Sequence, residues 1–241
     1  MRSIAVAVLI VGLVLGGCAS TKPVIDPGDG GDYSLKLNPA DFVRTISNPW
    51  LPLTPGSQWV YEGHEGDEVE RIKVIVTADT RKVFGIGATV VREVEWLNGR
   101  LVEDTLDWFA QDRKGNVWYL GEDSKAFSKD GGVSTAGSWE AGVDGALPGI
   151  IMLADPRIGK AYRQEYYPGE AEDMGEVIRR GASLTVPYGS FQGVLVTEEW
   201  TPLEPNVVEN KFYKAGVGLL LEKKVQGGSG RTELIRYRPA H

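Results

Sequence analysis

The sequence predicts an all-β, mainly antiparallel fold: a curved meander sheet, or a partly closed β-barrel or half-barrel, with a long irregular covering loop. Short segments in which apolar and polar residues alternate recur from Ser57 to Arg238. Aromatic and β-branched residues are concentrated in these segments, and turns rich in Gly, Asn and Pro separate them. About a dozen short strands with little helix favour a meander or a partly closed barrel.

The segment Glu103–Gly121 carries the strongest strand pattern and is predicted to form a β-hairpin. Apolar and polar residues alternate up to Ala110, Asp112–Asn116 supplies a turn with Gly and Asn, and Val117–Leu120 forms the return strand. A second hairpin is predicted at Asn98-Gly99, because this dipeptide readily adopts the positive φ values of a tight turn.

The remaining elements follow in chain order. Asn38 is predicted to cap a single helical turn that begins at Pro39, and three prolines between Asn48 and Gly56 favour an extended lead-in to the sheet. The other predicted strands are Ser57–Gly63, Glu68–Thr77, Gly85–Trp96, Arg100–Ala110, Gly159–Tyr167, Glu170–Arg180, Ala182–Val186, Val194–Thr201, Val207–Lys214, Val217–Val225 and Thr232–Arg238.

The segment Gly137–Pro156 interrupts this pattern. It has no clean period and is rich in Gly, yet it contains Trp139 and the apolar run Ile150–Leu153. Long irregular segments inside compact domains are usually functional or cover an apolar surface. We therefore expect this segment to be the covering loop, lying over the sheet as a lid.

The N-terminus has the pattern of a secretory signal. Arg2 precedes an apolar segment, Ile4–Leu15, that is too short to span a bilayer core of about 30 Å. Leu15-Gly16-Gly17-Cys18 then resembles the lipobox of bacterial lipoproteins. This resemblance implies that residues 1–17 are cleaved as a signal peptide, that the Cys18 sulfur is lipidated, and that the protein is anchored in the cell envelope. The residue after Cys18 is Ala19, whereas an aspartate at that position would resemble an inner-membrane retention signal. The outer membrane is therefore expected where the cell has two membranes.

The rest of the chain divides into two parts. Residues 18–37 are rich in Pro, Gly, Asp and Lys, and we interpret them as a flexible tether from the lipidated cysteine. Residues 38–241 are expected to form a single β-rich domain. The net charge is −7 and the pI is near 5.0, which argues against a nucleic-acid partner. Cys18 is the only cysteine, and two His residues leave no room for a histidine-based metal site.

Three segments resemble one group of uncharacterised bacterial envelope proteins. Leu51–Tyr61 looks like a "PLxPGxxWxY" segment, Val186–Phe191 like "P-x-G-x-F", and Tyr213–Leu220 like "Y-A-x-G-V-G-L". The folds of this group are similar to the half-barrels of periplasmic lipoprotein carriers, a curved antiparallel sheet around an apolar cavity. The resemblance therefore implies an envelope lipoprotein with a half-barrel. It implies no particular activity, because the group has no settled one.

Two kinds of side chain are candidates for a site. Aromatic and apolar residues of the central hairpin and the covering loop are expected to line a cavity for an apolar ligand, such as a lipid. They are Trp108, Trp118, Trp139, Ile150, Ile151 and Met152. Carboxylates of the acidic region 137–176 are weak candidates for Ca²⁺, without the spacing of a calcium-binding loop. They are Glu140, Asp144, Glu172 and Asp173. The plainer interpretation of the aromatic and apolar residues is that they pack in the core. The plainer interpretation of the carboxylates is that they form a solvated acidic face.

The sequence leaves three functions open. The leading hypothesis is a non-enzymatic, lipid-anchored envelope protein that binds an apolar ligand or an envelope partner on a curved sheet, with no cofactor. The second is an envelope hydrolase that uses carboxylates of the central hairpin and of the acidic loop. In the hairpin, Asp104 and Asp107 flank the central strand, and Glu122 and Asp123 lie at the far end of the hairpin. The third is a structural envelope protein stabilised by Ca²⁺. The sequence does not identify the protein partner or the ligand.

Overall fold

The computed structural model describes residues 33–240. The predicted signal peptide, the lipidated Cys18 and most of the tether lie outside these residues. No helix in the described part of the chain is both long enough and apolar enough to cross a membrane.

The described chain folds into strands, preceded by one short 3-10 turn, η1 (Pro39–Asp41). As predicted, Asn38 caps this turn, and its side chain accepts a hydrogen bond from the Ala40 amide at 3.1 Å. The strands are β1 (Phe42–Val43), β2 (Gln58–Glu65), β3 (Glu68–Val83), β4 (Ile86–Leu97), β5 (Arg100–Asp112), β6 (Val117–Phe127), β7 (Val133–Ser134), β8 (Trp139–Glu140), β9 (Leu147–Met152), β10 (Ala161–Arg163), β11 (Glu165–Tyr166), β12 (Met174–Val186), β13 (Gly189–Trp200), β14 (Val208–Lys214), β15 (Gly218–Gln226) and β16 (Arg231–Arg238).

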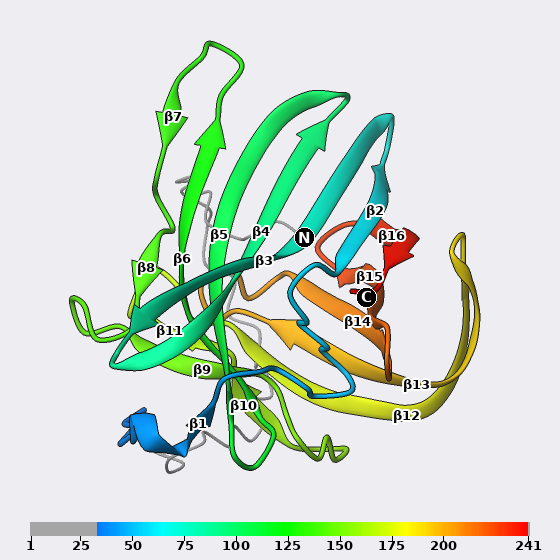
Figure 1. Cartoon of the computed structure of the whole chain (residues 1–241). Coiled ribbons are helices and arrows are strands. Elements are labelled where there is room, and N and C mark those ends of the chain that lie inside the picture. Colours follow the sequence, from blue (N-terminus) through cyan, green and yellow to red (C-terminus); the bar gives the residue numbers. More distant parts are fainter. Residues whose placement is uncertain (1–32, 241) are drawn as a thin grey trace, which may run out of the picture.

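The strands form one antiparallel sheet that curls into a nearly closed barrel with one unsealed seam (Figure 1). Thirteen strands form its main path, in the order β10-β12-β13-β14-β15-β16-β2-β3-β4-β5-β6-β9-β11. The C-terminal strand β16 pairs with β2, which joins the two ends of the chain within the sheet. The seam lies where β10 and β11 meet: β10 pairs with β12, whereas β11 pairs with β9. Gln164 lies between them, at the point where the chain changes from one edge to the other.

Both predicted hairpin turns are confirmed. Asn98 and Gly99 have φ values of 51° and 79° and connect β4 to β5, because these two residue types tolerate positive φ. The Asp112–Asn116 turn connects β5 to β6. One Asp112 carboxylate oxygen accepts hydrogen bonds from the Lys114 and Asn116 amides, each at 2.9 Å, which fixes the turn.

The segment Gly137–Pro156 differs from the expected irregular lid. It contributes β8 and β9 to the sheet, and both strands pair with β6. The apolar run Ile150–Met152 is therefore part of the barrel wall. Gly149 allows this placement, because a Cβ atom there would lie only 2.2 Å from the Gln164 backbone across the seam.

The end of the predicted tether also differs from expectation, because it lies against the domain. Tyr33 is buried, its hydroxyl donates a hydrogen bond to the Pro148 carbonyl at 2.5 Å, and its ring packs edge-on against Tyr166. Leu35 and Leu37 pack against the hydrophobic core. The folded part of the chain thus begins at least five residues before Asn38.

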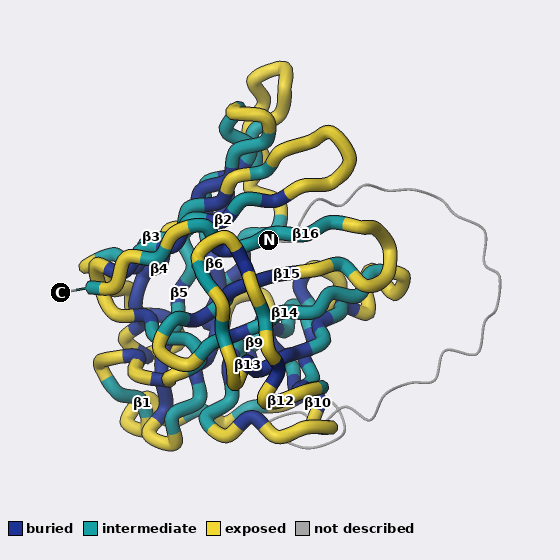
Figure 2. The backbone as a smooth tube through the Cα atoms, turned by 90° about the vertical axis from the view of Figure 1, so that its right-hand side faces the viewer, coloured by how far each residue is buried: buried dark blue, intermediate teal, exposed yellow. Residues whose placement is uncertain are grey.

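Buried residues are concentrated in the barrel wall, and exposed residues are concentrated at the turns (Figure 2). The core includes side chains from both halves of the sheet, among them Ile72, Leu120, Leu195, Leu220 and Leu234, each at most 1% exposed. Besides these apolar residues, the interior contains an unusual number of acidic side chains. Burying them without partners would be costly, so their surroundings define the candidate site.

Candidate functional site

The barrel encloses a cavity of about 180 Å³ that is both aromatic and acidic. Its wall is formed by strands on opposite sides of the barrel and by the extended segment before β2. The aromatic and apolar lining residues include Leu51, Leu53, Trp59, Tyr61, Val74, Val91, Phe109, Tyr119, Ile151, Tyr213 and Leu219. The charged and amide lining residues are Glu93, Asp107, Glu122, Gln164, Glu165, Asp173 and Lys211.

Tyr119 connects two carboxylates on one wall of the cavity. Asp107 and Glu122 are direct cross-strand partners in β5 and β6, so their side chains are on the same face. The Tyr119 hydroxyl lies 2.8 Å from an Asp107 oxygen and 3.0 Å from a Glu122 oxygen. A hydroxyl has a single proton to donate. When both contacts are full hydrogen bonds, one of the two carboxyl groups is therefore protonated and donates to the Tyr119 oxygen.

Burial strongly perturbs the carboxyl groups of this wall. It raises the pKa of Asp107 to about 7, against the lowering effect of the Tyr119 hydrogen bond. Burial, reinforced by the nearby Glu95 and Asp107 carboxylates, raises the pKa of Glu93 well above its usual range. The Glu165 pKa is also raised, first by burial and then by Asp173 and Glu122. These groups repel one another in a low-dielectric interior, so each one disfavours ionisation of the others.

Aromatic rings lie beside these carboxylates. Phe109 stacks on Tyr119, with ring centroids 4.9 Å apart, and Trp139 meets Tyr119 edge-on at 5.4 Å. The Trp139 indole N–H donates to a Glu165 oxygen at 3.2 Å. The ring system therefore orients two of the acidic side chains, Asp107 and Glu165, and gives the cavity an apolar surface next to them.

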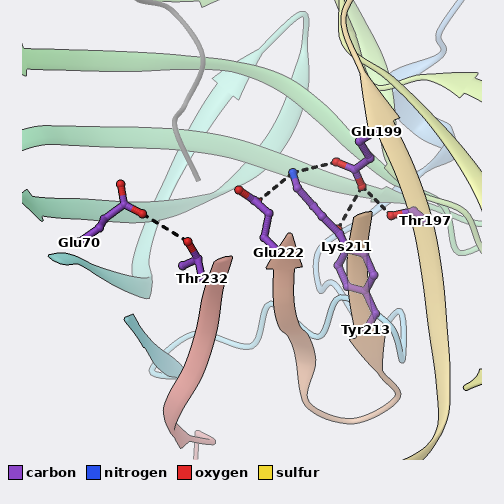
Figure 3. A network of polar contacts seen from close by, with 7 residues as sticks. All are labelled: Glu70, Thr197, Glu199, Lys211, Tyr213, Glu222 and Thr232. Atoms are coloured by element: carbon purple, nitrogen blue, oxygen red, sulfur yellow. Dashed lines mark hydrogen bonds and ion pairs between the residues drawn. The ribbon is translucent and has the colours of Figure 1, made fainter. Parts of the chain in front are cut away.

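A second acidic cluster lies on β13, β14 and β15, and here the chain supplies a cation (Figure 3). The Lys211 ammonium is 2.7 Å from a Glu199 oxygen and 3.6 Å from a Glu222 oxygen. Burial disfavours the charged ammonium, but these two carboxylates outweigh burial and raise the Lys211 pKa well above its usual range. Thr197 donates a further hydrogen bond to Glu199 at 2.8 Å.

Of the six residues predicted to bind a ligand, Ile151 lines the cavity. Trp139 lies directly behind the wall, in contact with Tyr119 and Glu165. Trp108 is on the opposite face of β5 from Asp107 and Phe109, where the Arg81 guanidinium lies 4.0 Å from its ring centroid. Trp118 is also buried away from the cavity, and its indole N–H donates to Asp112 at 3.0 Å. Ile150 and Met152 flank Ile151 on β9 and pack into the core on the other face of the strand.

The four calcium candidates are not brought together as a set of ligands. Glu140 forms an ion pair with Arg81 at 2.6 Å, and Asp144 is exposed in a turn with φ of 49°. Glu172 accepts a hydrogen bond from the Gly169 amide at 2.8 Å, whereas Asp173 lines the cavity. Within residues 33–240, no group of three or more His, Cys, Asp or Glu side chains has the arrangement of a metal site.

Sequence reasoning missed Glu93, Gln164, Glu165 and Lys211 as cavity residues. A signal for Glu93 was present, because the polar residues Glu93 and Glu95, and again Glu103, Thr105 and Asp107, recur at every second position. Such spacing places their side chains on one face of a strand. Gln164 and Glu165 had no comparable signal, because their position depends on how the barrel edges meet.

Comparisons with known proteins give only distant matches. The chain matches no protein-family model and no curated protein. A solved structure from Bacteroides fragilis, a protein with a YmcC-like fold that is inferred to be exported, has a TM-score of 0.44 at 12% identity. That match covers 79% of this chain and 99% of the other. A protein from Parabacteroides distasonis that is inferred to be a lipoprotein has a TM-score of 0.34 at 12% identity, with coverages of 80% and 99%.

Proposed function

We propose that this chain is a lipid-anchored protein of the bacterial cell envelope whose barrel binds a small apolar or amphipathic molecule. The observation that carries the proposal is the cavity of about 180 Å³, lined by aromatic residues from β2, β5, β6 and β14. Concave sites with apolar walls and a few polar groups are typical of small-molecule binding. The lipobox-like sequence that ends at Cys18 supports the anchor and the envelope location.

The size of the cavity limits the ligand. An engineered apolar cavity of about 150 Å³ is large enough to bind benzene. The cavity of this barrel is similar, so it suits a molecule with one ring or a short chain better than a whole diacyl lipid. An intact lipid would have to leave most of its acyl chains outside.

Native mass spectrometry with organic extraction tests this function. The chain is produced from Thr21, which removes the anchor and keeps every described residue. We expect a co-purifying small molecule at near-stoichiometric amount. Ile151→Phe, which adds a ring to the cavity wall, should lose this molecule. The exposed control Val225→Phe should retain it. A ligand-free mass that persists after incubation with envelope extracts would contradict the proposal.

A second candidate function, a carboxylate-dependent hydrolase, is favoured by one observation. Asp107, with its pKa near 7, shares Tyr119 with Glu122, so one carboxyl group can be protonated while the other is ionised. Such a pair supplies an acid and a base. A hydrolytic activity on envelope glycans or esters that is lost in Asp107→Asn and retained in Asp104→Asn would favour this candidate.

A further inference from the structure

We propose that the cavity binds a small organic cation: an amine or quaternary ammonium attached to a ring-sized apolar body. Its cationic group would lie among the carboxylates of Glu93, Asp107 and Glu165, and its apolar body against the aromatic wall. This inference rests on the proposed function, that the barrel binds a small molecule, and adds the charge and shape of that molecule.

The inside of the cavity carries more acidic than basic groups. Five carboxyl groups line it, whereas Lys211 is the one cation among the described lining residues. Lys211 is already held by Glu199 on β13 and Glu222 on β15, at 2.7 Å and 3.6 Å (Figure 3). Within residues 33–240, Glu93, Asp107 and Glu165 form no ion pair with a Lys or Arg side chain. A buried carboxylate without a counter-charge is costly, and a cationic ligand would remove that cost.

An aromatic surface lies beside these carboxylates. Tyr119 holds Asp107 by its hydroxyl and stacks on Phe109, so an acidic group and two ring faces converge on one side of the cavity. Cations are attracted to aromatic faces within about 6 Å, most strongly in a desolvated site. Carboxylates and rings together select a cation that is partly apolar. A bare metal ion would leave the apolar walls of Val91 and Ile151 without a role.

Gln164 is a further buried polar residue of the cavity and is not part of the acidic cluster. Its side chain lines the cavity at the barrel seam and is only 3% exposed, and its amide nitrogen makes no hydrogen bond of normal geometry. This nitrogen carries two N–H donors. A contact with the neighbouring Tyr162 hydroxyl would use one donor and leave the other. A buried donor of this kind fits a ligand that brings an acceptor as well as its cationic group; benzylammonium probes the cationic group and the ring alone.

Calorimetric titration of the full-length chain in lipid nanodiscs, with empty nanodiscs as reference, tests the inference. The probes are benzylammonium and benzyl alcohol, which share a ring and nearly the same size and differ in charge. At about pH 8, where the cavity carboxylates are more ionised than in acid, benzylammonium should bind at least about tenfold more tightly than benzyl alcohol. Benzyl alcohol binding equally or more tightly would overturn the inference and leave the proposed function standing. Binding of neither probe would overturn both.

Matched variants locate the cation. Asp107→Asn should weaken benzylammonium binding about tenfold, as expected for one lost charge-assisted contact, and weaken binding of the uncharged benzyl alcohol less. Asp104→Asn is the control, because Asp104 is three residues away on the same strand and pairs with Arg92 outside the cavity. If Asp107→Asn does not fold, Glu165→Gln replaces it, since its amide oxygen can still accept from Trp139. Equal benzylammonium affinities in the cavity variant and in Asp104→Asn would overturn the assignment.

Discussion

Two acidic clusters face the inside of the same barrel, and they differ in whether the chain supplies a cation. On β13–β15, Lys211 lies between Glu199 and Glu222 and neutralises them in part. On β4–β6 and β11, no Lys or Arg of the described chain pairs with Glu93, Asp107 or Glu165. The first cluster therefore joins neighbouring strands, whereas the second leaves a charge that a ligand can satisfy.

The pKa shifts in the two clusters favour different states: the charged form of Lys211 and the neutral form of Asp107. The Glu199 and Glu222 carboxylates raise the pKa of the Lys211 ammonium despite its burial, which keeps the ion pairs formed over the physiological range. Burial raises the pKa of the Asp107 carboxyl to about 7, which keeps it close to protonation at neutral pH. A buried group with a balanced partner stays charged, and a buried group without one moves toward neutrality.

The largest effect is expected from removing the cation of the first cluster. Lys211→Met keeps the length of the side chain and leaves Glu199 and Glu222 facing each other without the ammonium. Breaking a buried ion pair from one side costs about 3–5 kcal/mol, so the free energy of unfolding should fall by that amount. Urea denaturation followed by tryptophan fluorescence measures this change.

Lys214→Met is the matched control on the same strand. The Lys214 ammonium donates to the exposed Gln192 carbonyl at 2.7 Å and faces no buried carboxylate among the described residues. Its loss should cost less than about 1 kcal/mol. Equal losses of unfolding free energy in the two variants would show that the buried ion pairs of Lys211 stabilise the fold no more than the exposed contact of Lys214.

The second cluster should make the stability of the chain depend on pH. The folded-state pKa of Asp107 is raised from 3.8 to about 7, so between these values the folded chain binds a proton that the unfolded chain releases. Stability should therefore fall as pH rises through this window. Glu93, Glu103, Glu122, Glu165 and the Tyr119 hydroxyl surround Asp107 from β4, β5, β6 and β11.

Asp107→Asn removes the titrating group and isolates its share of this pH dependence. The variant should gain stability relative to the wild type as pH rises from about 4 to about 7, by about 3 kcal/mol. Thermal unfolding at a series of pH values measures the difference. A constant difference between variant and wild type across this window would contradict the raised pKa.

The smallest effect is expected at an exposed ion pair on the outside of the same strands. Arg92 makes a two-pronged contact with Asp104, at 2.8 Å and 2.6 Å. Exposed pairs contribute about 0.2–1 kcal/mol, so Asp104→Asn should change the free energy of unfolding by no more than this. A loss of unfolding free energy as large as that of Lys211→Met would show that ion pairs inside and outside the barrel contribute equally to stability.

Much of the fold was predictable because strand periodicity and turn chemistry are local. The alternation in Glu68–Thr77 and the Asn98-Gly99 dipeptide fix the face of a strand and the position of a turn within a few residues. Closure of the barrel was less predictable. The seam at Gln164 depends on close packing of Gly149 against a distant backbone, which no local pattern encodes.

The site was harder to predict because the strands carry apolar residues on both faces. Trp108 was a candidate ligand contact because of its place in the central hairpin Glu103–Gly121, where it alternates with Asp107 and Phe109. The structure shows Trp108 buried on the other face under Arg81, and Asp107 and Phe109 in the cavity wall. Periodicity gives two faces, and only the three-dimensional packing tells which one encloses the cavity.

A crystal structure of the protein with benzylammonium would test the central claim most directly. We expect the ligand inside the barrel, with its nitrogen within hydrogen-bond distance of the Asp107 or Glu165 carboxylate and its ring against Tyr119 and Phe109. A ligand bound outside the barrel, or one whose nitrogen points away from these carboxylates, would show that the cavity is not a site for organic cations.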